Sequence, residues 1–180
     1  MHMNKYYPHL FSPIKVGRVT LKNRIMSAPM GLPEQSENRH LADFNIATHE
    51  ARARGGAASS CVGDCCVSHE GRALIKQMCM DDPLVIPSLT RCARTIKRYD
   101  CVPVMELSHA GMFGMVPGLA NPEATGRTSY GPVEMFMENG THVVAMDEAE
   151  MARIAECYAD SARKALMCGY EMIILHGGHG

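Results

Sequence analysis

Short apolar runs alternate along this chain with longer segments whose apolar residues recur every three or four positions. An apolar run of about four to eight residues bounded by Gly or Pro is typical of a buried strand, and spacings of three and four are typical of an amphipathic helix. A small β-hairpin is predicted at residues 10–21. Buried strands are predicted after it at residues 23–31, 57–62, 102–107 and 170–175.

The segments between these strands carry helix signals. Good helix formers fill residues 41–54 and two glycines follow, and apolar residues recur at helical spacing in residues 84–99. A further helix is predicted to begin at Asp147, with Glu150 as an acidic variant of the capping box, and to end at Gly169. The predicted apolar face of this last helix consists of Met151, Ile154, Ala155, Tyr158, Ala162, Ala165 and Leu166.

Alternating strands and helices predict parallel strands joined by crossover helices. A (β/α) barrel and a doubly wound sheet both have this alternation, and both gather the segments that follow the strands at one edge. The alternation alone does not separate the two. Residues 109–142 are rich in Gly, Pro, Asn and Ser, and we interpret them as a long functional loop.

Composition narrows the classes of function. The 18 Lys and Arg residues nearly balance the 19 Asp and Glu residues, so no overall field favours nucleic acid or an anionic membrane. No apolar run approaches the roughly 20 residues of a membrane-spanning helix. The start of the chain lacks a secretory signal, so the eight cysteines are expected to be reduced thiols and the protein cytoplasmic. One domain over residues 1–180 is expected.

Several blocks, in order along nearly the whole chain, resemble the NADH:flavin oxidoreductases related to Old Yellow Enzyme. The likeness is greatest to the branch that contains dienoyl-CoA, bile-acid and tetrapyrrole (bilirubin) reductases. The blocks that carry the resemblance are residues 10–17, 21–25, 28–31, 50–56, 107–111 and 176–180.

The resemblance implies an α/β fold of the (β/α)8 TIM-barrel type, of which only the first half, strands 1 to 4, is present. It also implies an FMN-dependent enzyme that reduces activated C=C bonds of small conjugated substrates with NAD(P)H. A 4Fe-4S cluster would belong only to a longer parent protein. A complete barrel needs about 250 residues, so we expect either a fragment or a homo-oligomer that closes the sheet, because open strand edges invite association.

The resemblance also assigns residues to the cofactor. Gly31 stands where many relatives have Cys or Thr, and Glu106 stands where many have a Gln bonded to the pyrimidine edge of the flavin. A carboxylate can only accept a hydrogen bond there unless it is protonated. The full set of implied flavin-binding residues is Ala28, Pro29, Met30, Gly31, Gly63, Asp64 and Glu106.

His176 and His179 match the pair of residues that, in the family, holds the electron-withdrawing group of the substrate. Hydride addition to the β-carbon pushes negative charge onto that group, and two N–H donors would stabilise it. Family members often follow this motif with a proton donor, but Gly180 ends the sequence. The residue that protonates the α-carbon is therefore not identified.

Other interpretations of the same residues remain. The histidine pair could bind zinc, but the sequence has no Cys-x-x-Cys pair and Cys65 and Cys66 are adjacent, so no metal is predicted. His109 could approach the flavin or could structure the turn before Gly111. For the whole chain, the alternatives are a non-catalytic half-barrel and a metal-dependent barrel enzyme.

Overall fold

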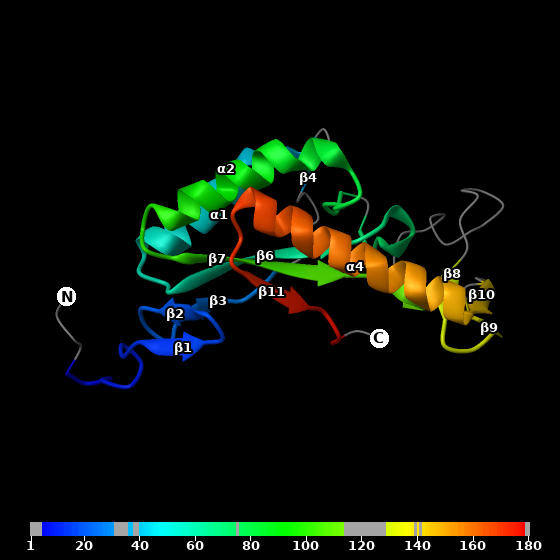
Figure 1. Ribbon diagram of the computed structural model, residues 1–180, viewed down its shortest axis with the longest axis horizontal. Helices are drawn as coiled ribbons and strands as arrows, with labels where there is room; N and C mark the ends of the chain where they lie inside the picture. Colours follow the sequence, from blue (N-terminus) through cyan, green and yellow to red (C-terminus); the bar gives the residue numbers. More distant parts are fainter. Residues whose placement is uncertain are drawn as a thin grey trace.

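The central element of the fold is a four-stranded parallel sheet with strand order β11-β7-β6-β3 (Figure 1). The computed structural model describes residues 5–30, 36–37, 40–74, 76–113, 129–138, 140 and 142–178. The strands of this sheet are β3 (Met26–Ser27), β6 (Ser59–Cys66), β7 (Val102–Ser108) and β11 (Met172–Leu175).

The crossover helices form one layer on one side of this sheet (Figure 1). They are α1 (Asp43–Arg54), α2 (Ile86–Lys97) and α4 (Glu148–Cys168), and α2 packs against both of the others. A doubly wound sheet reverses its strand order and carries helices on both faces. Here the strand order follows the sequence without reversal, so the sheet is the barrel type, open at β3 and at β11.

Local signals explain where α4 begins and ends. The Asp147 carboxylate accepts a hydrogen bond from the Glu150 backbone N–H at 2.7 Å. Gly169 ends the helix in the left-handed conformation with φ of 98°, which glycine adopts at little cost. The predicted N-cap at Asp147 and the predicted end at Gly169 are confirmed. The predicted apolar face is wrong in part, because Leu166 is 70% exposed while Ser161 is buried.

The hydrophobic core lies between the sheet and the helix layer. Leu89 and Ile96 of α2 meet Met105 and Leu107 of β7 there, and Tyr170 closes one side. Burying such side chains is the main stabilising contribution in a domain of this size.

Strand β6 differs from its prediction. It continues through Gly63 and Asp64 to Cys66, so these two residues lie within the strand and not after it. The pairing with β7 shifts register between Val62 and Cys65, and the Gly63–Asp64 peptide bond is cis. The buried, small Cys65 and Cys66 side chains resume the strand after the irregularity.

The prediction of one long loop over residues 109–142 is wrong at its ends. A short 3₁₀ helix, η3 (Gly111–Phe113), follows β7. A second sheet with order β8-β10-β9 is formed by β8 (Ser129–Gly131), β9 (Met135–Phe136) and β10 (His142–Ala145). Residues 114–128 lie outside the described residues. These strands are too short to show a period in the sequence.

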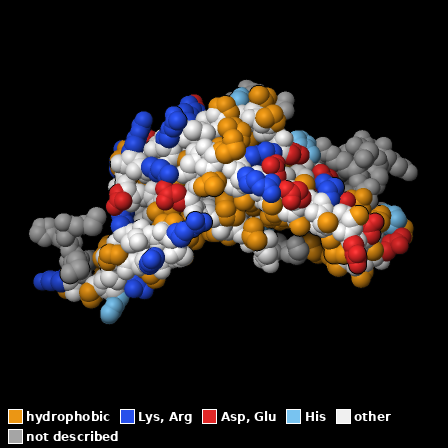
Figure 2. Space-filling model, viewed as in Figure 1, with side chains coloured by type: hydrophobic (Ala, Val, Ile, Leu, Met, Phe, Trp, Pro, Cys, Tyr) orange, Lys and Arg blue, Asp and Glu red, His pale blue; other side chains and the backbone are white. Residues whose placement is uncertain are grey.

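The remaining elements are small. The predicted hairpin is confirmed as β1 (Ile14–Val16) and β2 (Val19–Leu21), which pair antiparallel. Within the described ranges, no helix is long and apolar enough to cross a membrane. Basic and acidic side chains are interspersed over the face shown in Figure 2. The other short elements are β4 (Ser36–Glu37), β5 (His40–Leu41), η1 (His69–Gly71) and η2 (Pro83–Val85).

Candidate active site at the carboxyl ends of the strands

Predicted site residues from β3, β6 and β7 meet around Gly63. A Cβ atom at Gly63 would lie 2.7 Å from the Cβ of Glu106 and 2.9 Å from the Cβ of Pro29. No side chain fits at that distance, so glycine permits the close approach of three chain segments. The strand ends thus place Pro29, Gly63 and Glu106 in one contiguous surface.

His176 joins this surface through Glu106. Its Nδ1 lies 3.0 Å from Oε1 of Glu106, whose side chain is 8% exposed while that of His176 is 26% exposed. The His176 backbone N–H also donates to the Leu107 carbonyl at 2.9 Å, so β7 holds both the backbone and the ring. An ionised carboxylate can only accept, so opposite an ionised Glu106 Nδ1 is the donor in this pair.

A polar network fixes Asp64 next to this pair. The Ser108 hydroxyl donates to Oδ2 of Asp64 at 3.1 Å, and the Gln77 amide donates to Ser108 Oγ at 3.1 Å. Gln77 is buried and its carbonyl accepts from the Ala73 backbone N–H at 2.7 Å. Sequence reasoning missed Ser108 and Gln77. Ser108 was detectable, because it follows Glu106 by two residues and so shares its face of β7.

The other predicted flavin-binding and catalytic residues are either exposed or outside the described residues. Ala28 and Met30 follow β3 and are exposed, and the Arg52 guanidinium lies 3.7 Å from Sδ of Met30. Gly31 and His179 lie outside the described residues. Their assignment to the flavin and to the substrate stays a prediction.

The thiols around the second strand are inert in this setting. Burial, together with the negative charge of Glu106, raises the pKa of Cys61 to about 12. Burial also raises the pKa of Cys65 well above its usual range. A thiol that stays protonated is a poor nucleophile, so these side chains act by packing.

His109 structures the turn after β7. Its Nδ1 accepts the backbone N–H of Gly111 at 3.0 Å. Its ring packs on Gly71, where a Cβ atom would lie too close to the ring to be accommodated. Burial lowers the pKa of His109, so the ring stays neutral. These contacts favour the turn role over the flavin contact.

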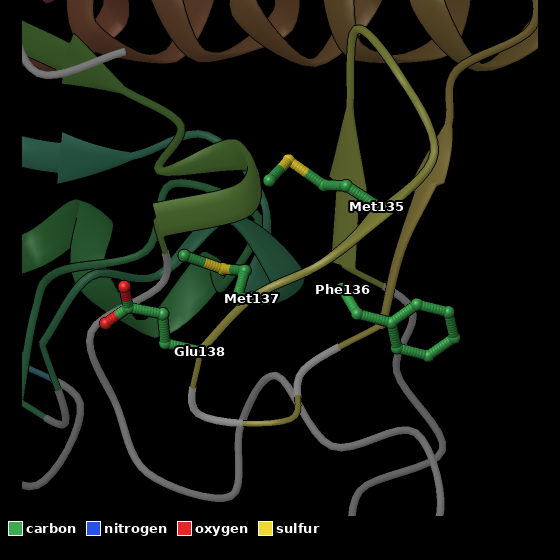
Figure 3. A pocket seen from close by; sticks show the side chains of 4 residues that line it. All are labelled: Met135, Phe136, Met137 and Glu138. Atoms are coloured by element: carbon green, nitrogen blue, oxygen red, sulfur yellow. The ribbon is translucent and has the colours of Figure 1, made fainter.

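A cavity of about 410 Å³ lies away from this surface, on the second sheet. Figure 3 shows its lining residues, Met135, Phe136, Met137 and Glu138, along a single segment of chain. Among the described residues, the lining comes from these four consecutive positions alone, so it joins no groups from separate described elements. We therefore centre the site on Glu106 and His176.

The sequence pattern of the NADH:flavin oxidoreductase / NADH oxidase family matches residues 9–180. The chain belongs to this family, in which FMN is used with NAD(P)H. The resemblance to this family is confirmed, and the likeness to the dienoyl-CoA, bile-acid and tetrapyrrole reductase branch stays a prediction.

Curated relatives extend the comparison. An NADPH dehydrogenase from Bacillus licheniformis is 29% identical over 173 residues, which cover 95% of this chain and 48% of the relative. A metal reductase from Desulforamulus reducens is 31% identical, over 90% of this chain and 23% of the relative. An NADH:acrylate oxidoreductase from Vibrio harveyi is 27% identical, over 89% of this chain and 16% of the relative. The chain thus spans about half of the first relative and less of the others.

A solved structure shows the same fold. Old Yellow Enzyme from Pichia sp. AKU4542 superposes with a TM-score of 0.83 at 18% identity, covering 93% of this chain and 45% of that chain. At this identity the likeness concerns the fold alone. It confirms that the open sheet is part of a (β/α) barrel.

Proposed function

We propose that this chain contributes to an FMN-dependent enzyme that reduces activated C=C bonds of small conjugated molecules with NAD(P)H. The observation that carries the proposal is the His176–Glu106 pair at the carboxyl ends of β11 and β7, the edge where barrel enzymes hold their active sites. The relative named for acrylate, an activated alkene, supports this choice of substrate class.

The residues around Gly63 fit the ring system of FMN. Because Gly63 has no side chain, Pro29 and Glu106 pack directly against β6. The second carboxylate oxygen of Glu106 would accept an N–H of the pyrimidine edge. Asp64 lies beside it, and Ala28, Met30 and Gly31 would border the ring. When bound, FMN supplies the hydride that adds to the double bond.

His176 would polarise the substrate. Glu106 orients the ring through Nδ1. Nε2 is the proposed donor to the carbonyl oxygen of the substrate. For Nε2 to donate as well, the pair must carry two protons, one between the carboxylate and Nδ1 and one on Nε2. Such a donor stabilises the negative charge that develops on the oxygen. His179 is the proposed second donor.

A non-catalytic half-barrel is the second candidate, and one observation favours it. The sheet is open at β3 and at β11, and Leu175 is largely exposed at the second of these edges. Association with another half-barrel or homo-oligomerisation would cover the edges.

We propose the cytoplasm as the location, which the eight free thiols support.

The test is flavin retention followed by turnover. The purified protein is incubated with FMN, desalted, examined for flavin absorbance, and then assayed anaerobically with NADH or NADPH and acrylate or a cyclic enone. Retained flavin and oxidation of the nicotinamide that depends on the alkene support the enzyme. Colourless protein favours the non-catalytic half-barrel, and bound flavin that no alkene reoxidises contradicts the proposed function.

A further inference from the structure

A cluster of three potential metal ligands lies outside the proposed active site. One ligand atom each from His69, Cys79 and Asp81 lies within 4.8 Å of the other two. His69 is the first residue of the 3₁₀ helix η1. The backbone of Cys79 pairs in parallel with that of Cys66 at the end of β6, and both thiols are free. The cluster therefore belongs to the segment that connects β6 to α2.

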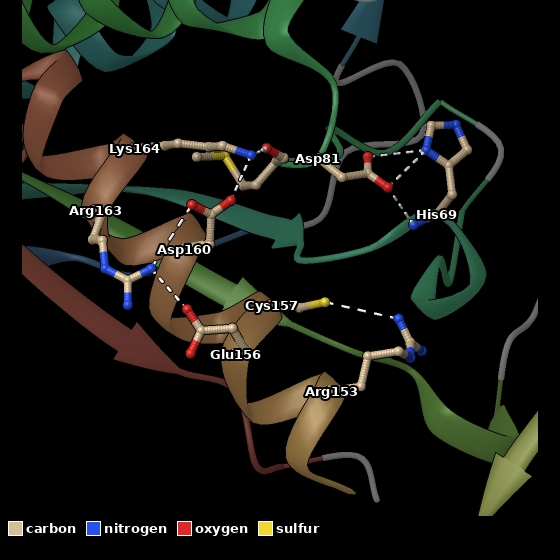
Figure 4. Close-up of polar contacts among 9 residues, drawn as sticks. His69, Asp81, Arg153, Glu156, Cys157, Asp160, Arg163 and Lys164 are labelled. Carbon is tan, nitrogen blue, oxygen red and sulfur yellow. Dashed lines mark hydrogen bonds and ion pairs between the residues drawn. The ribbon is translucent and has the colours of Figure 1, made fainter. Parts of the chain in front are cut away.

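The three ligands of the cluster differ in their exposure to solvent. Cys79 is 2% exposed, whereas the side chains of His69 and Asp81 are 39% and 40% exposed. The His69 Nδ1 lies 3.0 Å from Oδ1 of Asp81, and the His69 backbone N–H donates to Oδ2 at 2.9 Å. Figure 4 shows these two side chains facing each other beside α4.

Backbone contacts on both sides of Cys79 hold the ligands in place. The Cys66 N–H donates to the Met78 carbonyl at 2.8 Å, and the Met80 N–H donates to the Cys66 carbonyl at 2.8 Å. Lys164 of α4 donates to the Met80 carbonyl at 3.0 Å. The frame of β6 and α4 is thus set before any ligand arrives, which lowers the ordering cost of binding.

Two cationic side chains of α4 near this segment are engaged by other carboxylates, and one of them, Lys164, pairs with Asp160 at 2.7 Å. Arg153 forms ion pairs with Glu70 at 2.5 Å and with Glu150 at 2.6 Å. Its charge is compensated by these carboxylates and not by Asp81. A cation that enters from solvent would displace the hydrogen bonds between His69 and Asp81 and the proton of the Cys79 thiol.

We propose that His69, Cys79 and Asp81 form a binding site for a divalent, thiophilic cation of the zinc class, with water at the fourth position. Nitrogen, sulfur and carboxylate oxygen are the three ligand types that Zn²⁺ takes, at about 2.0 to 2.3 Å. Ca²⁺ and Mg²⁺ prefer oxygen ligands alone, so the thiol and the imidazole select against them. Small rotations of the two half-exposed side chains bring all three ligands to the ion.

The chain offers two matched controls. His142 and Glu134 form a histidine–carboxylate pair at the same 3.0 Å and with similar exposure of the histidine, but the metal-ligand group among the described residues does not include them. Cys157 is a half-buried thiol on α4, near the cluster but outside it. His142→Ala therefore removes an equivalent pair, and Cys157→Ser removes a neighbouring thiol.

The experiment titrates the purified protein with Co²⁺, which replaces Zn²⁺ and reports thiolate ligation by near-ultraviolet charge-transfer absorption. We expect this absorption in the wild type, its loss in Cys79→Ser, and affinity weakened at least tenfold in His69→Ala and Asp81→Asn. His142→Ala and Cys157→Ser should match the wild type. Circular dichroism checks folding. If Cys79→Ser is unfolded, the Co²⁺ affinities of His69→Ala and Asp81→Asn decide the test.

Two outcomes would overturn the site. The first is a wild-type titration without a thiolate band at millimolar Co²⁺. The second is a band that survives in folded Cys79→Ser, because the thiolate would then lie elsewhere, or a Co²⁺ affinity equal to that of the wild type in both His69→Ala and Asp81→Asn. The readout does not depend on flavin or turnover, so failure here leaves the proposed oxidoreductase function unaffected.

Discussion

Two histidine–carboxylate pairs with the same separation lie in different surroundings. His176 and Glu106 are 3.0 Å apart at the strand ends, as are His69 and Asp81 on the segment between β6 and α2. In the first pair the carboxylate is buried and part of β7. In the second pair both side chains are half exposed and a buried thiol adjoins them.

The difference teaches that the groups around a pair, and not the distance within it, indicate its role. A buried carboxylate backed by a strand fixes the direction of one imidazole ring, which suits a polarising donor. A half-exposed pair beside a thiol suits a cation that arrives from solvent. The His142–Glu134 pair has neither feature, and it serves as the reference for both.

The largest expected effect separates the first pair from the others. In the full-length, flavin-loaded protein, His176→Ala should lower the rate of alkene reduction by on the order of a hundredfold or more, because a transition-state donor is lost. Flavin content should not change. Turnover equal to that of the wild type would remove His176 from the mechanism.

A buried histidine without a carboxylate partner extends the comparison to stability. Burial, and secondarily the charge of Arg52, lowers the pKa of His49 from 6.5 to about 4, and its Nδ1 lies 2.9 Å from Ser60 Oγ. The unfolded chain binds a proton near pH 6.5 and the folded chain only near pH 4, so stability is lost as pH falls between these values.

This loss should be about 2–3 kcal/mol of unfolding free energy. Denaturant unfolding at pH 7 and at pH 4.5 measures it, and His49→Gln, which cannot titrate, should show a correspondingly smaller loss. An equal loss in both proteins would assign the acid sensitivity to other groups.

Within the first pair, Glu106 is expected to act through His176. Glu106→Leu removes the acceptor of Nδ1 and should lower kcat for alkene reduction about tenfold, consistent with about 1.5 kcal/mol for a charged hydrogen bond. Glu106→Gln keeps an acceptor oxygen and should recover most of the rate. Equal rates for the two variants would show that Glu106 does not position the ring.

The smallest effect is expected at the second pair. His69→Ala should leave alkene reduction within about twofold of the wild type and, without added metal, should change the unfolding free energy by less than about 1 kcal/mol, as is usual for exposed ion pairs. Steady-state kinetics and denaturant unfolding measure both. A large fall in turnover would connect this cluster to the active site.

The fold was predictable wherever local signals were strong. Asp147 and Gly169 mark the ends of α4 by their own hydrogen-bonding and backbone chemistry, and the apolar run at residues 102–107 needed no context. Strand β6 was truncated in prediction because Gly and Asp are poor strand residues. Its continuation depends on β7, which pairs with it again after the register shift.

The site was predictable only in part, for a related reason. The family motifs supplied Glu106 and His176, but not their direct contact, which depends on the parallel pairing of β11 with β7. The cluster of His69, Cys79 and Asp81 has no recognisable ligand spacing in the sequence. It forms because backbone pairing between residues 66 and 79 folds the connecting segment back onto the end of β6.

The most direct test of the account is a double-mutant cycle between Glu106 and His176, measured as the anaerobic rate at which acrylate reoxidises the reduced flavin of the full-length protein. If the two side chains act as one unit, the double variant Glu106→Leu/His176→Ala is as slow as His176→Ala alone, a coupling of about 1.4 kcal/mol for a tenfold effect. If the two losses multiply instead, the residues act independently and the account of this site is wrong.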